Sequence, residues 1–461
     1  MKINYNIKDF LSSLIFYLAI LVFIIGFNFT DSPPPFGWYQ QFMPNIGGRQ
    51  ISDIFFLDSL TGWAVTNNPN QDSAYVLKTT NSGDNWFILY RKLIGAGYSG
   101  YFRVYFLNQN TGYTCGVPGF YKSTDGGLSW VLIRTTDTYL DMSVLNVDTQ
   151  WLVSSNLLTG GVFRTTNGGV NWDRQFSGGT QNPNTIYMYN ARIGFISNNS
   201  ALPNIYKTTN SGMNWDMVLS GENFDDMHFI DSLLGWKCWA NYYAGDSSVK
   251  RTTDGGLNWI KQQLPHGGII LTSQIFKFSF INRDTIWGTG GQVFYGGGRF
   301  RGILYRTTNG GNNWLFQIPD TSYGIPGYGS IQFVNKNIGW AYNNAIGIHT
   351  TTGGNDTFYT LIKQISSKVP DKFMLGQNYP NPFNPSTNIK YQIINKSYVK
   401  LTVYDIMGKE VKVILNQKQS AGKYEVKFDG SGLSTGVYLY KIEINYGKEV
   451  YTQTKKMLLI K

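Results

Sequence analysis

The chain has only two Cys and three His among its 461 residues. The three His (His228, His266 and His349) share no metal-ligand spacing, which argues against a structural zinc site or a zinc-protease helix. Charged residues are only 15% of the sequence, while aromatic residues reach 16%, a balance that suits a rigid sheet protein. We therefore predict no metal and no cofactor.

Acidic residues are also in the minority, since the formal net charge is +11. This excess could indicate a nucleic-acid partner, but its distribution argues against one. Residues 365–461 hold 15 Lys against 7 Asp and Glu, a net +8, which leaves residues 36–364 almost neutral. The basic character therefore reports the solubility of the C-terminal region, and no nucleic-acid partner is predicted.

Long apolar runs are absent except near the N-terminus. Lys2 and Lys8 precede the apolar run Leu14–Phe27, which is typical of a secretory signal peptide. An uncleaved anchor is the alternative, because Phe10–Phe29 approaches the roughly 20 residues that span a bilayer and no Ala-x-Ala site follows. We favour a signal peptide over residues 1–30, and hence no stable membrane span in the mature protein, because Asp31–Pro35 ends any helix.

One nine-residue tract returns along the chain, reading basic-Thr/Ser-Thr-Asn/Asp-Gly/Ser-Gly-x-Asn/Ser-Trp. The Asn or Asp side chain can accept hydrogen bonds from turn amides, and Gly supplies positive φ, so each tract predicts a hairpin turn between two strands. The spacing is 42 to 44 residues, apart from one interval of 55. The copies are Lys78–Trp86, Lys122–Trp130, Arg164–Trp172, Lys207–Trp215, Arg251–Trp259 and Arg306–Trp314, with a decayed copy at His349–Phe358.

A second repeat interleaves with the first and has the form Phe-x5-Gly-Trp, as in Phe56–Trp63 and Phe229–Trp236. Each unit then holds four short antiparallel strands, A to D, which is one blade of a propeller. Seven units predict an all-β chain with a seven-bladed β-propeller over residues 36–365. Phe36–Phe42 resembles an extra D strand, so we expect it to close the last blade, in competition with Phe358–Ile365.

The two Cys occupy equivalent places in the second and fifth units, three residues after the repeat Gly. Those blades lie nearly opposite each other in a ring of seven, whereas a disulfide needs Cα atoms within about 7 Å. We predict that Cys115 and Cys238 are two separate buried thiols.

The turn tracts resemble the Asp-box, or BNR, repeat of sialidases, with Ser123–Trp130 the best match. The unit with both motifs more closely resembles the photosystem II assembly and stability factor propellers, which are also seven-bladed. In families that carry the Asp box it is a structural turn. The resemblance therefore implies that Asp125 and Asp254 are turn residues and not catalysts.

The repeat stops after Ile365. Residues 366–372 are predicted to form a linker, and six or seven short alternating strands over residues 373–461 predict a small immunoglobulin-like β-sandwich. This tail closely resembles the type A C-terminal sorting domain of the type IX, or Por, secretion system. The matching motifs are Gln377–Pro385, Val403–Ile406 with Gly408, Ala421–Tyr424, Gly436–Tyr438 and Thr454–Lys461.

That resemblance implies Sec export to the periplasm and then passage to the extracellular space or the outer-membrane surface. Its partners would be the type IX translocon and its sortase. The residues carried over to the sorting signal are Gly436, Tyr438, Lys455, Lys456 and Lys461.

All the length variation among the predicted blades falls on one face, formed by the D–A and B–C connections. Variable loops on a regular scaffold are where binding usually occurs, and Tyr and Arg are common at binding surfaces. For any single Tyr, covering the channel mouth is the better interpretation; for the set, binding is. The candidate ligand-binding residues are Tyr242, Tyr243, Tyr295, Arg299, Arg301, Tyr323 and Tyr328.

We therefore predict a non-enzymatic, exported recognition or scaffold protein whose long-loop face binds an unknown protein or glycan. The alternative is a glycan-processing hydrolase of sialidase or xyloglucanase type. Such an enzyme needs two facing carboxylates, and the acids concentrated on this face are Glu222, Asp225, Asp226 and Asp246. A third possibility, an assembly chaperone for a membrane complex, fits poorly with a sorting tail that directs the protein out of the cell.

Overall fold

The computed structural model describes residues 37–67, 72–94, 100–117, 119–135, 137–154, 156, 158–177, 183–198, 203–239, 248–265, 270–294, 299–319, 324–354, 362–366, 368–430, 433–447 and 449–460. The expected signal peptide over residues 1–30 lies outside these ranges. Within them every regular element is a β-strand, and none is a helix long and apolar enough to cross a membrane.

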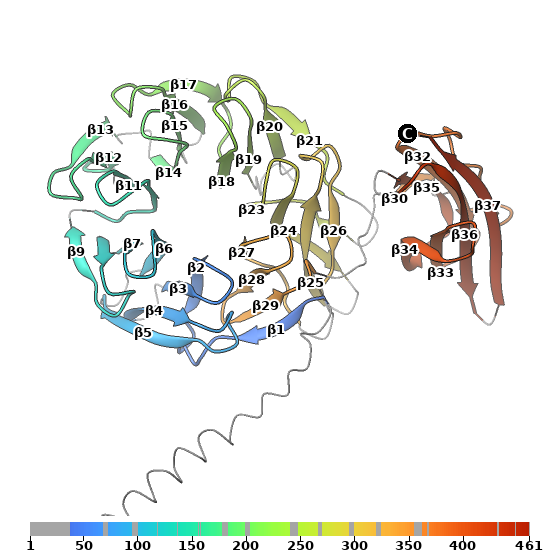
Figure 1. The fold of residues 1–461 in the computed structure, drawn as a ribbon, viewed down its shortest axis with the longest axis horizontal. Coiled ribbons are helices and arrows are strands. Elements are labelled where there is room, and N and C mark those ends of the chain that lie inside the picture. Colours follow the sequence, from blue (N-terminus) through green and yellow to red (C-terminus); the bar gives the residue numbers. More distant parts are fainter. Residues whose placement is uncertain are drawn as a thin grey trace, which may run out of the picture. The chain divides into compact units, whose positions relative to one another are not determined.

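Seven antiparallel sheets among the described residues follow one another around a central opening, which confirms the seven-bladed propeller (Figure 1). In blades 1 to 5 chain order and strand order agree, with strand A innermost and strand D outermost. Blade 1 holds β2 (Gln50–Phe56), β3 (Gly62–Asn67), β4 (Ser73–Thr79) and β5 (Phe87–Leu93). Blade 2 holds β6 (Tyr101–Phe106), β7 (Gly112–Gly116), β8 (Phe120–Ser123) and β9 (Val131–Arg134).

The next three blades repeat this plan with short strands. Blade 3 holds β10 (Asp141–Val144), β11 (Gln150–Ser154), β12 (Gly161–Thr165) and β13 (Asp173–Ser177). Blade 4 holds β14 (Pro183–Met188), β15 (Gly194–Asn198), β16 (Asn204–Thr208) and β17 (Asp216–Ser220). Blade 5 holds β18 (Asp226–Phe229), β19 (Gly235–Trp239), β20 (Ser248–Thr252) and β21 (Ile260–Gln262).

Blade 6 is larger than the others, and this accounts for the one long interval between turn tracts. Its B and C strands extend together as a long hairpin, and an additional strand, β22, pairs with the extension. From sequence we count residues 288–302 among the variable B–C connections of the long-loop face, but they are mostly strand. The elements are β22 (Ile270–Thr272), β23 (Lys277–Phe280), β24 (Ile286–Phe294), β25 (Phe300–Thr307) and β26 (Leu315–Gln317).

Blade 7 is completed by the N-terminal strand. It holds β27 (Ser330–Phe333), β28 (Gly339–Asn343) and β29 (Ile346–Thr350), and β1 (Tyr39–Phe42) pairs with β29 as the outermost strand. This confirms the predicted closure by the Trp38 segment. The competing segment has another partner, because β30 (Ile362–Ser366) pairs with β35 in the C-terminal sandwich.

The second repeat forms the contacts between blades. In blade 1 a Cβ on Gly62 would lie 2.6 Å from the ring of Phe56, so only Gly leaves room for that ring. The residue after Gly then stacks on the corresponding Phe of the next blade: Trp63 lies 3.7 Å from Phe106 and Trp340 lies 3.6 Å from Phe56, between ring centroids. Such stacking contributes about 0.5–1.5 kcal/mol per pair beyond the burial of apolar area.

The C-terminal region is a sandwich of two four-stranded sheets around its own apolar core. One sheet has the order β30, β35 (Gly422–Asp429), β32 (Ser386–Ile393), β31 (Met374–Leu375). The other has the order β34 (Glu410–Gln419), β33 (Ser397–Tyr404), β36 (Gly436–Tyr446), β37 (Glu449–Leu459). The expected boundaries at residues 365 and 373 need correction, because β30 shows that sandwich pairing begins at residue 362.

A substitution at Trp38 tests how much closure by the N-terminal strand contributes to the stability of the propeller. Its side chain is 4% exposed, its ring packs edge-on against Trp287 and Phe333, and its Nε1 donates to Gln317 Oε1 at 2.7 Å. We expect Trp38→Ala to lower the free energy of unfolding by about 3–5 kcal/mol. Phe42→Ala is the matched control: Phe42 ends β1, the strand that Trp38 directly precedes, but it is 60% exposed, so its loss should cost within about 0.5 kcal/mol in chemical denaturation. Equal effects would show that closure does not depend on the Trp38 contacts.

The same closure should weaken in acid, because His349 is buried between β1 and the ring of Trp340. Burial lowers the pKa of His349 from 6.5 to about 4. The unfolded chain therefore takes up a proton first, and stability present above pH 6.5 is lost as the pH falls towards 4, by up to about 3 kcal/mol. His349→Phe should remove this component, so its stability should vary less than that of the wild type between pH 7 and 4. A parallel pH dependence in the two proteins would contradict this role.

Candidate functional site

The repeated turn tracts are held by their own side chains. In the best copy, Ser123 Oγ accepts from Gly127 N at 2.8 Å, and Asp125 Oδ1 accepts from Ser129 N at 2.9 Å. The Ser129 hydroxyl and amide lower the pKa of Asp125 to about 2. Asp254 makes the equivalent bond to Asn258 N at 2.9 Å, and the Asn258 contacts lower its pKa to about 2. Both carboxylates act within the turn, as predicted.

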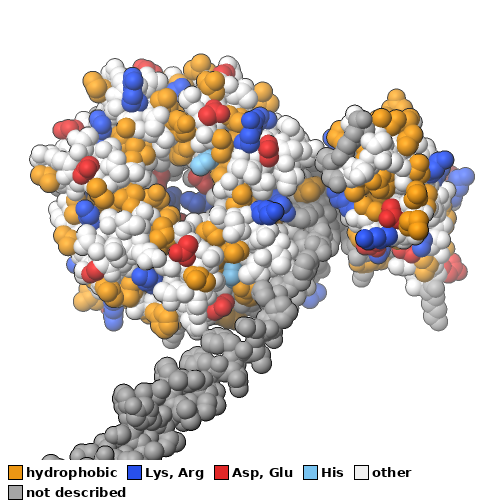
Figure 2. Space-filling model, viewed as in Figure 1, with side chains coloured by type: hydrophobic (Ala, Val, Ile, Leu, Met, Phe, Trp, Pro, Cys, Tyr) orange, Lys and Arg blue, Asp and Glu red, His pale blue; other side chains and the backbone are white. Residues whose placement is uncertain are grey.

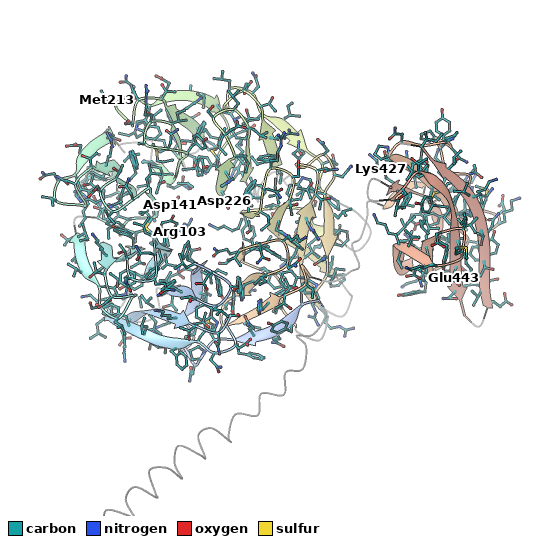
Figure 3. The ribbon with its side chains drawn as sticks, in the orientation of Figure 1. Arg103, Asp141, Met213, Asp226, Lys427 and Glu443 are labelled. Atoms are coloured by element: carbon teal, nitrogen blue, oxygen red, sulfur yellow. The ribbon has the colours of Figure 1, made fainter. Side chains whose placement is uncertain are left out.

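The central channel contains a cavity of about 600 Å³ lined by the innermost strands. Side chains alternate along a strand, so every second residue of each A strand faces the opening. The position three residues before the end of strand A forms a ring rich in charge. Its members are Asp53, Arg103, Asp141, Thr185, Asp226, Lys277 and Ser330, and Figure 3 labels three of them around the opening.

The charged side chains of this ring form hydrogen bonds with each other and with backbone amides of the neighbouring blade. Asp53 accepts from Val104 N at 3.1 Å, and Asp226 accepts from Phe278 N at 2.8 Å. Each carboxylate thus satisfies a backbone amide of the blade that follows. Similarly, Asp141 accepts from Ile186 N at 3.0 Å, while its other oxygen accepts from Arg103 Nε at 3.0 Å.

The electrostatics of the ring follow from this mixture of signs. Burial raises the pKa of Asp53, although Lys277 and Arg103 oppose the shift. The carboxylate of Asp226 holds the pKa of Lys277 above its ordinary value despite burial. The ring is therefore a set of mutually compensating charges between blades, and its first role is structural. Its sequence signal was available, since aligning the seven A strands brings these residues to one position.

The channel ring lies towards the long-loop end of the propeller. Each A strand enters from its D–A connection, and three of the charged residues are the first residues of their strands: Asp141, Asp226 and Lys277. The short A–B turns begin at the other end of these strands. The space-filling view shows both signs of charge around the opening (Figure 2).

Four of the seven candidate ligand-binding residues lie outside the described residues: Tyr242, Tyr243, Tyr295 and Tyr323. Arg299 is exposed directly before β25, and Arg301 lies on that strand opposite Val293. The same hairpin carries Phe294 and Phe300, 42% and 37% exposed, whose rings lie 5.3 Å apart. Sequence reasoning named the two arginines but missed the phenylalanines, because it treated the segment as a loop.

Tyr328 needs a correction. Its side chain is only 3% exposed and packs in a core cluster with Ile325 and Leu304. Its carbonyl accepts from the Thr289 hydroxyl at 2.8 Å. Because its ring is enclosed by apolar neighbours, Tyr328 cannot present a side chain to a ligand. Tyr328 instead supports the short segment that contains Pro326. Gln292 Nε2 donates to Pro326 O in that segment at 2.8 Å.

The acids proposed for a hydrolase are mostly engaged in other interactions. Glu222 pairs with Lys237 at 2.7 Å and also with Lys250. These two cations lower the pKa of Glu222 although burial works in the opposite direction. Lys237 is itself fully buried and lies over the ring of Trp259. Asp246 lies outside the described residues, and Asp226 belongs to the channel ring described above.

The two cysteines are free and buried, as predicted, and burial raises the pKa of both thiols. Among the described residues, no group of three or more His, Cys, Asp or Glu side chains could hold a metal ion.

The residues predicted to form the sorting signal lie mainly on the last two strands. Gly436 begins β36, and the Tyr438 hydroxyl donates to Ser434 O at 2.8 Å. Lys455 and Lys456 lie on β37, the second with its side chain exposed. Lys461 lies outside the described residues. Their role in recognition stays a prediction.

Residues 377–460 match the family model described as the secretion system C-terminal sorting domain. The tail is a type IX sorting domain. The chain is thus a propeller joined to a sorting tail, and the tail directs export to the cell surface or outer membrane through the type IX system. None of the curated proteins matches this sequence.

Solved propellers resemble the chain in fold. A structure titled "YCF48 bound to D1 peptide" has a TM-score of 0.51 and 18% identity, covering 68% of this chain and 97% of that one. A GH74 enzyme from Niastella koreensis has a TM-score of 0.43 and 12% identity, covering 84% of each chain. A GH74 xyloglucanase from Xanthomonas campestris has a TM-score of 0.35 and 9% identity, with 77% and 79% covered. At these identities the first supports the propeller fold, and the other two carry no weight.

The turn role of Asp125 can be separated from a chemical role by paired substitutions. Asn occupies the equivalent position in four other tracts, for example Asn81, whose Oδ1 accepts from Asn85 N at 3.0 Å. Asp125→Asn should therefore stay within about 0.5 kcal/mol of wild-type stability, whereas Asp125→Ala should cost about 1–2 kcal/mol. Thermal unfolding of both variants checks this, and equal destabilisation by Asn and Ala would show that the carboxylate is required.

Proposed function

We propose that the mature protein is a non-catalytic recognition module at the cell surface that binds a polypeptide or glycan ligand through the long-loop face of its propeller. The supporting observation is the β24–β25 hairpin of blade 6. This hairpin is longer than its counterparts and gathers Phe294, Phe300, Arg299 and Arg301 at its end. Exposed aromatic rings beside arginine are the composition of binding surfaces.

The hairpin is also well supported by its neighbours, which suits a binding element. β22 pairs with β24 on the side of the hairpin where strand A also pairs, from Ile270 to Thr272. Gly302 N donates to Ile325 O at 3.0 Å, and Gln292 donates to Pro326 O, so the D–A connection of blade 7 buttresses it. A buttressed hairpin loses little conformational entropy when a ligand binds.

A peptide ligand has one further support. The similar propeller structure titled "YCF48 bound to D1 peptide" shows by its title that a propeller of this shape can bind a peptide. Hydrolysis is less well supported here, because Glu222 is neutralised by two lysines and the channel aspartates accept backbone amides. A glycosidase acid needs a raised pKa and a free carboxyl group.

The test is a binding screen of the mature chain against peptide and glycan arrays, followed by Kd measurement for any hit. We expect the double variant Phe300→Ala/Arg301→Ala to weaken binding about tenfold or more. The matched control is Phe87→Ala/Arg91→Ala on β5, which removes the same residue types from another exposed strand and should change Kd less than about twofold.

Two outcomes would contradict the proposal. Equal binding by the hairpin variant and the wild type, with an unchanged Tm, would place the ligand elsewhere. Cleavage of a bound glycan by the wild type would make the protein a hydrolase, and loss of that cleavage in Asp53→Asn would locate the chemistry in the channel.

A further inference from the structure

The outer edge of β37 is unprotected in a way that the other edges of the sandwich are not. Each four-stranded sheet has two edge strands, which are β30 and β31 in one sheet and β34 and β37 in the other. Edge strands expose unpaired backbone groups and usually carry bulges, charges or prolines, or are very short. Comparing the four edges therefore shows where another strand can pair.

Three of the edges are blunted. β31 is two residues long, and β30 has a register shift between Gln364 and Ser366. β34 has two register shifts against β33, at Leu401/Thr402 and Val403/Tyr404. In contrast, β37 pairs with β36 over eleven residues, from Glu449 to Leu459, with no shift. It is thus the long, regular edge of this sandwich.

Part of that edge is already covered by the chain itself. The proline-rich segment Gln377–Pro385, which precedes β32, runs parallel to the end of β37 at Phe383. Phe383 N donates to Leu458 O at 2.9 Å, and Ile460 N donates to Phe383 O at 3.0 Å. Gln377 Nε2 donates to Lys456 O at 2.8 Å. The C-terminal half of the edge therefore already pairs with an added segment, which shows that its geometry accepts one.

The N-terminal half of the edge is open. Because the register is regular, Val450, Thr452 and Thr454 point their backbone groups outward as Leu458 does. Within the described part of the chain, the N–H and C=O groups of these three residues have no hydrogen-bond partner. Their side chains are exposed, and none is charged or proline. Nothing in this stretch resists the addition of a strand.

We propose that Val450–Thr454 is a docking edge that pairs with an extended strand of the type IX export machinery. The sorting domain spans residues 377–460 and so includes this whole edge, and its function requires a partner in the machinery. Pairing through main-chain groups gives affinity without demanding particular side chains, as in other cases of strand addition. The edge is thus the main-chain component of the sorting signal, beside the side chains named from sequence.

The experiment follows the full-length chain in a host with a type IX system, measuring the fraction that reaches the cell surface and the fraction held in the periplasm. Thr452→Pro removes one outward N–H and places a ring on the edge, while the pairing with β36 stays intact because that residue points away from it. We expect the surface fraction to fall about tenfold, as for loss of a main-chain hydrogen bond with added steric exclusion. Thr452→Val, which keeps the N–H, should export like the wild type.

Folding is checked by the Tm of each purified variant. If Thr452→Pro lowers the Tm, Val450→Pro and Thr454→Pro repeat the test at neighbouring outward residues, and the double variant Val450→Lys/Thr452→Lys blocks the edge by charge without altering the backbone. A chain lacking residues 362–461 gives the export value for no sorting domain.

Wild-type export by the stably folded proline and lysine variants would overturn the proposal. So would a second copy of this chain as the occupant, which would appear as a wild-type dimer in solution that becomes a monomer in Thr452→Pro with export unchanged. Failure of export in Thr452→Val as well would assign recognition to the side chain, and would also overturn the main-chain interpretation.

Discussion

The propeller depends on one interlocking contact between neighbouring blades. A Phe at the end of strand A occupies the space that a Gly on strand B leaves free, and the aromatic residue after that Gly covers the Phe of the next blade. Trp63 on Phe106 and Trp340 on Phe56 are stacked pairs of this kind. Trp287 stacks on Phe333 in the same way, although Ile286 replaces the Gly before it. The contact requires the next blade to sit at a fixed angle, so repeating it generates a ring.

The stability of the propeller depends on the contact that closes it, between blade 7 and blade 1. Trp340 Nε1 donates to Ser82 O at 2.7 Å, as Trp63 Nε1 does to Gly126 O at the next junction. Gln332 bonds to both backbone groups of Phe56, so side chains of blade 7 bind blade 1 directly. The outermost strand of blade 7 nevertheless comes from the other end of the chain. Trp38 bonds to Gln317, 279 positions away, and Tyr39 bonds to His349, 310 positions away. The last blade is therefore complete only when the two ends of the propeller sequence meet, and such long-range contacts slow folding.

Closure also forms the channel and determines what it can do. The inward-facing positions of strand A carry both signs of charge, and the aspartates among them accept hydrogen bonds from backbone amides of the next blade, so the channel lining is part of the blade contacts. A lining committed to structure leaves the outer loops and hairpins as the freer surface for a ligand. In the sorting sandwich the free surface is a strand edge. Part of the β37 edge stays unpaired, whereas the other three edges are short or have register shifts.

The repeats in the sequence were sufficient to determine the blade number, the closing strand, the separate thiols and the turn role of Asp125 and Asp254, because each is a local pattern repeated at a fixed period. The type of tail was also determined by local motifs. The boundary near residue 365 was not, because β30 is extended like a D strand and only its pairing with β35 assigns it to the sandwich. The burial of Tyr328, the strands in residues 288–302 and the bonds within the charged ring of the channel likewise depend on pairing within blade 6 and on contacts between neighbouring blades. Local patterns specify strands and turns, whereas which faces and edges remain open is decided only when those strands pack together.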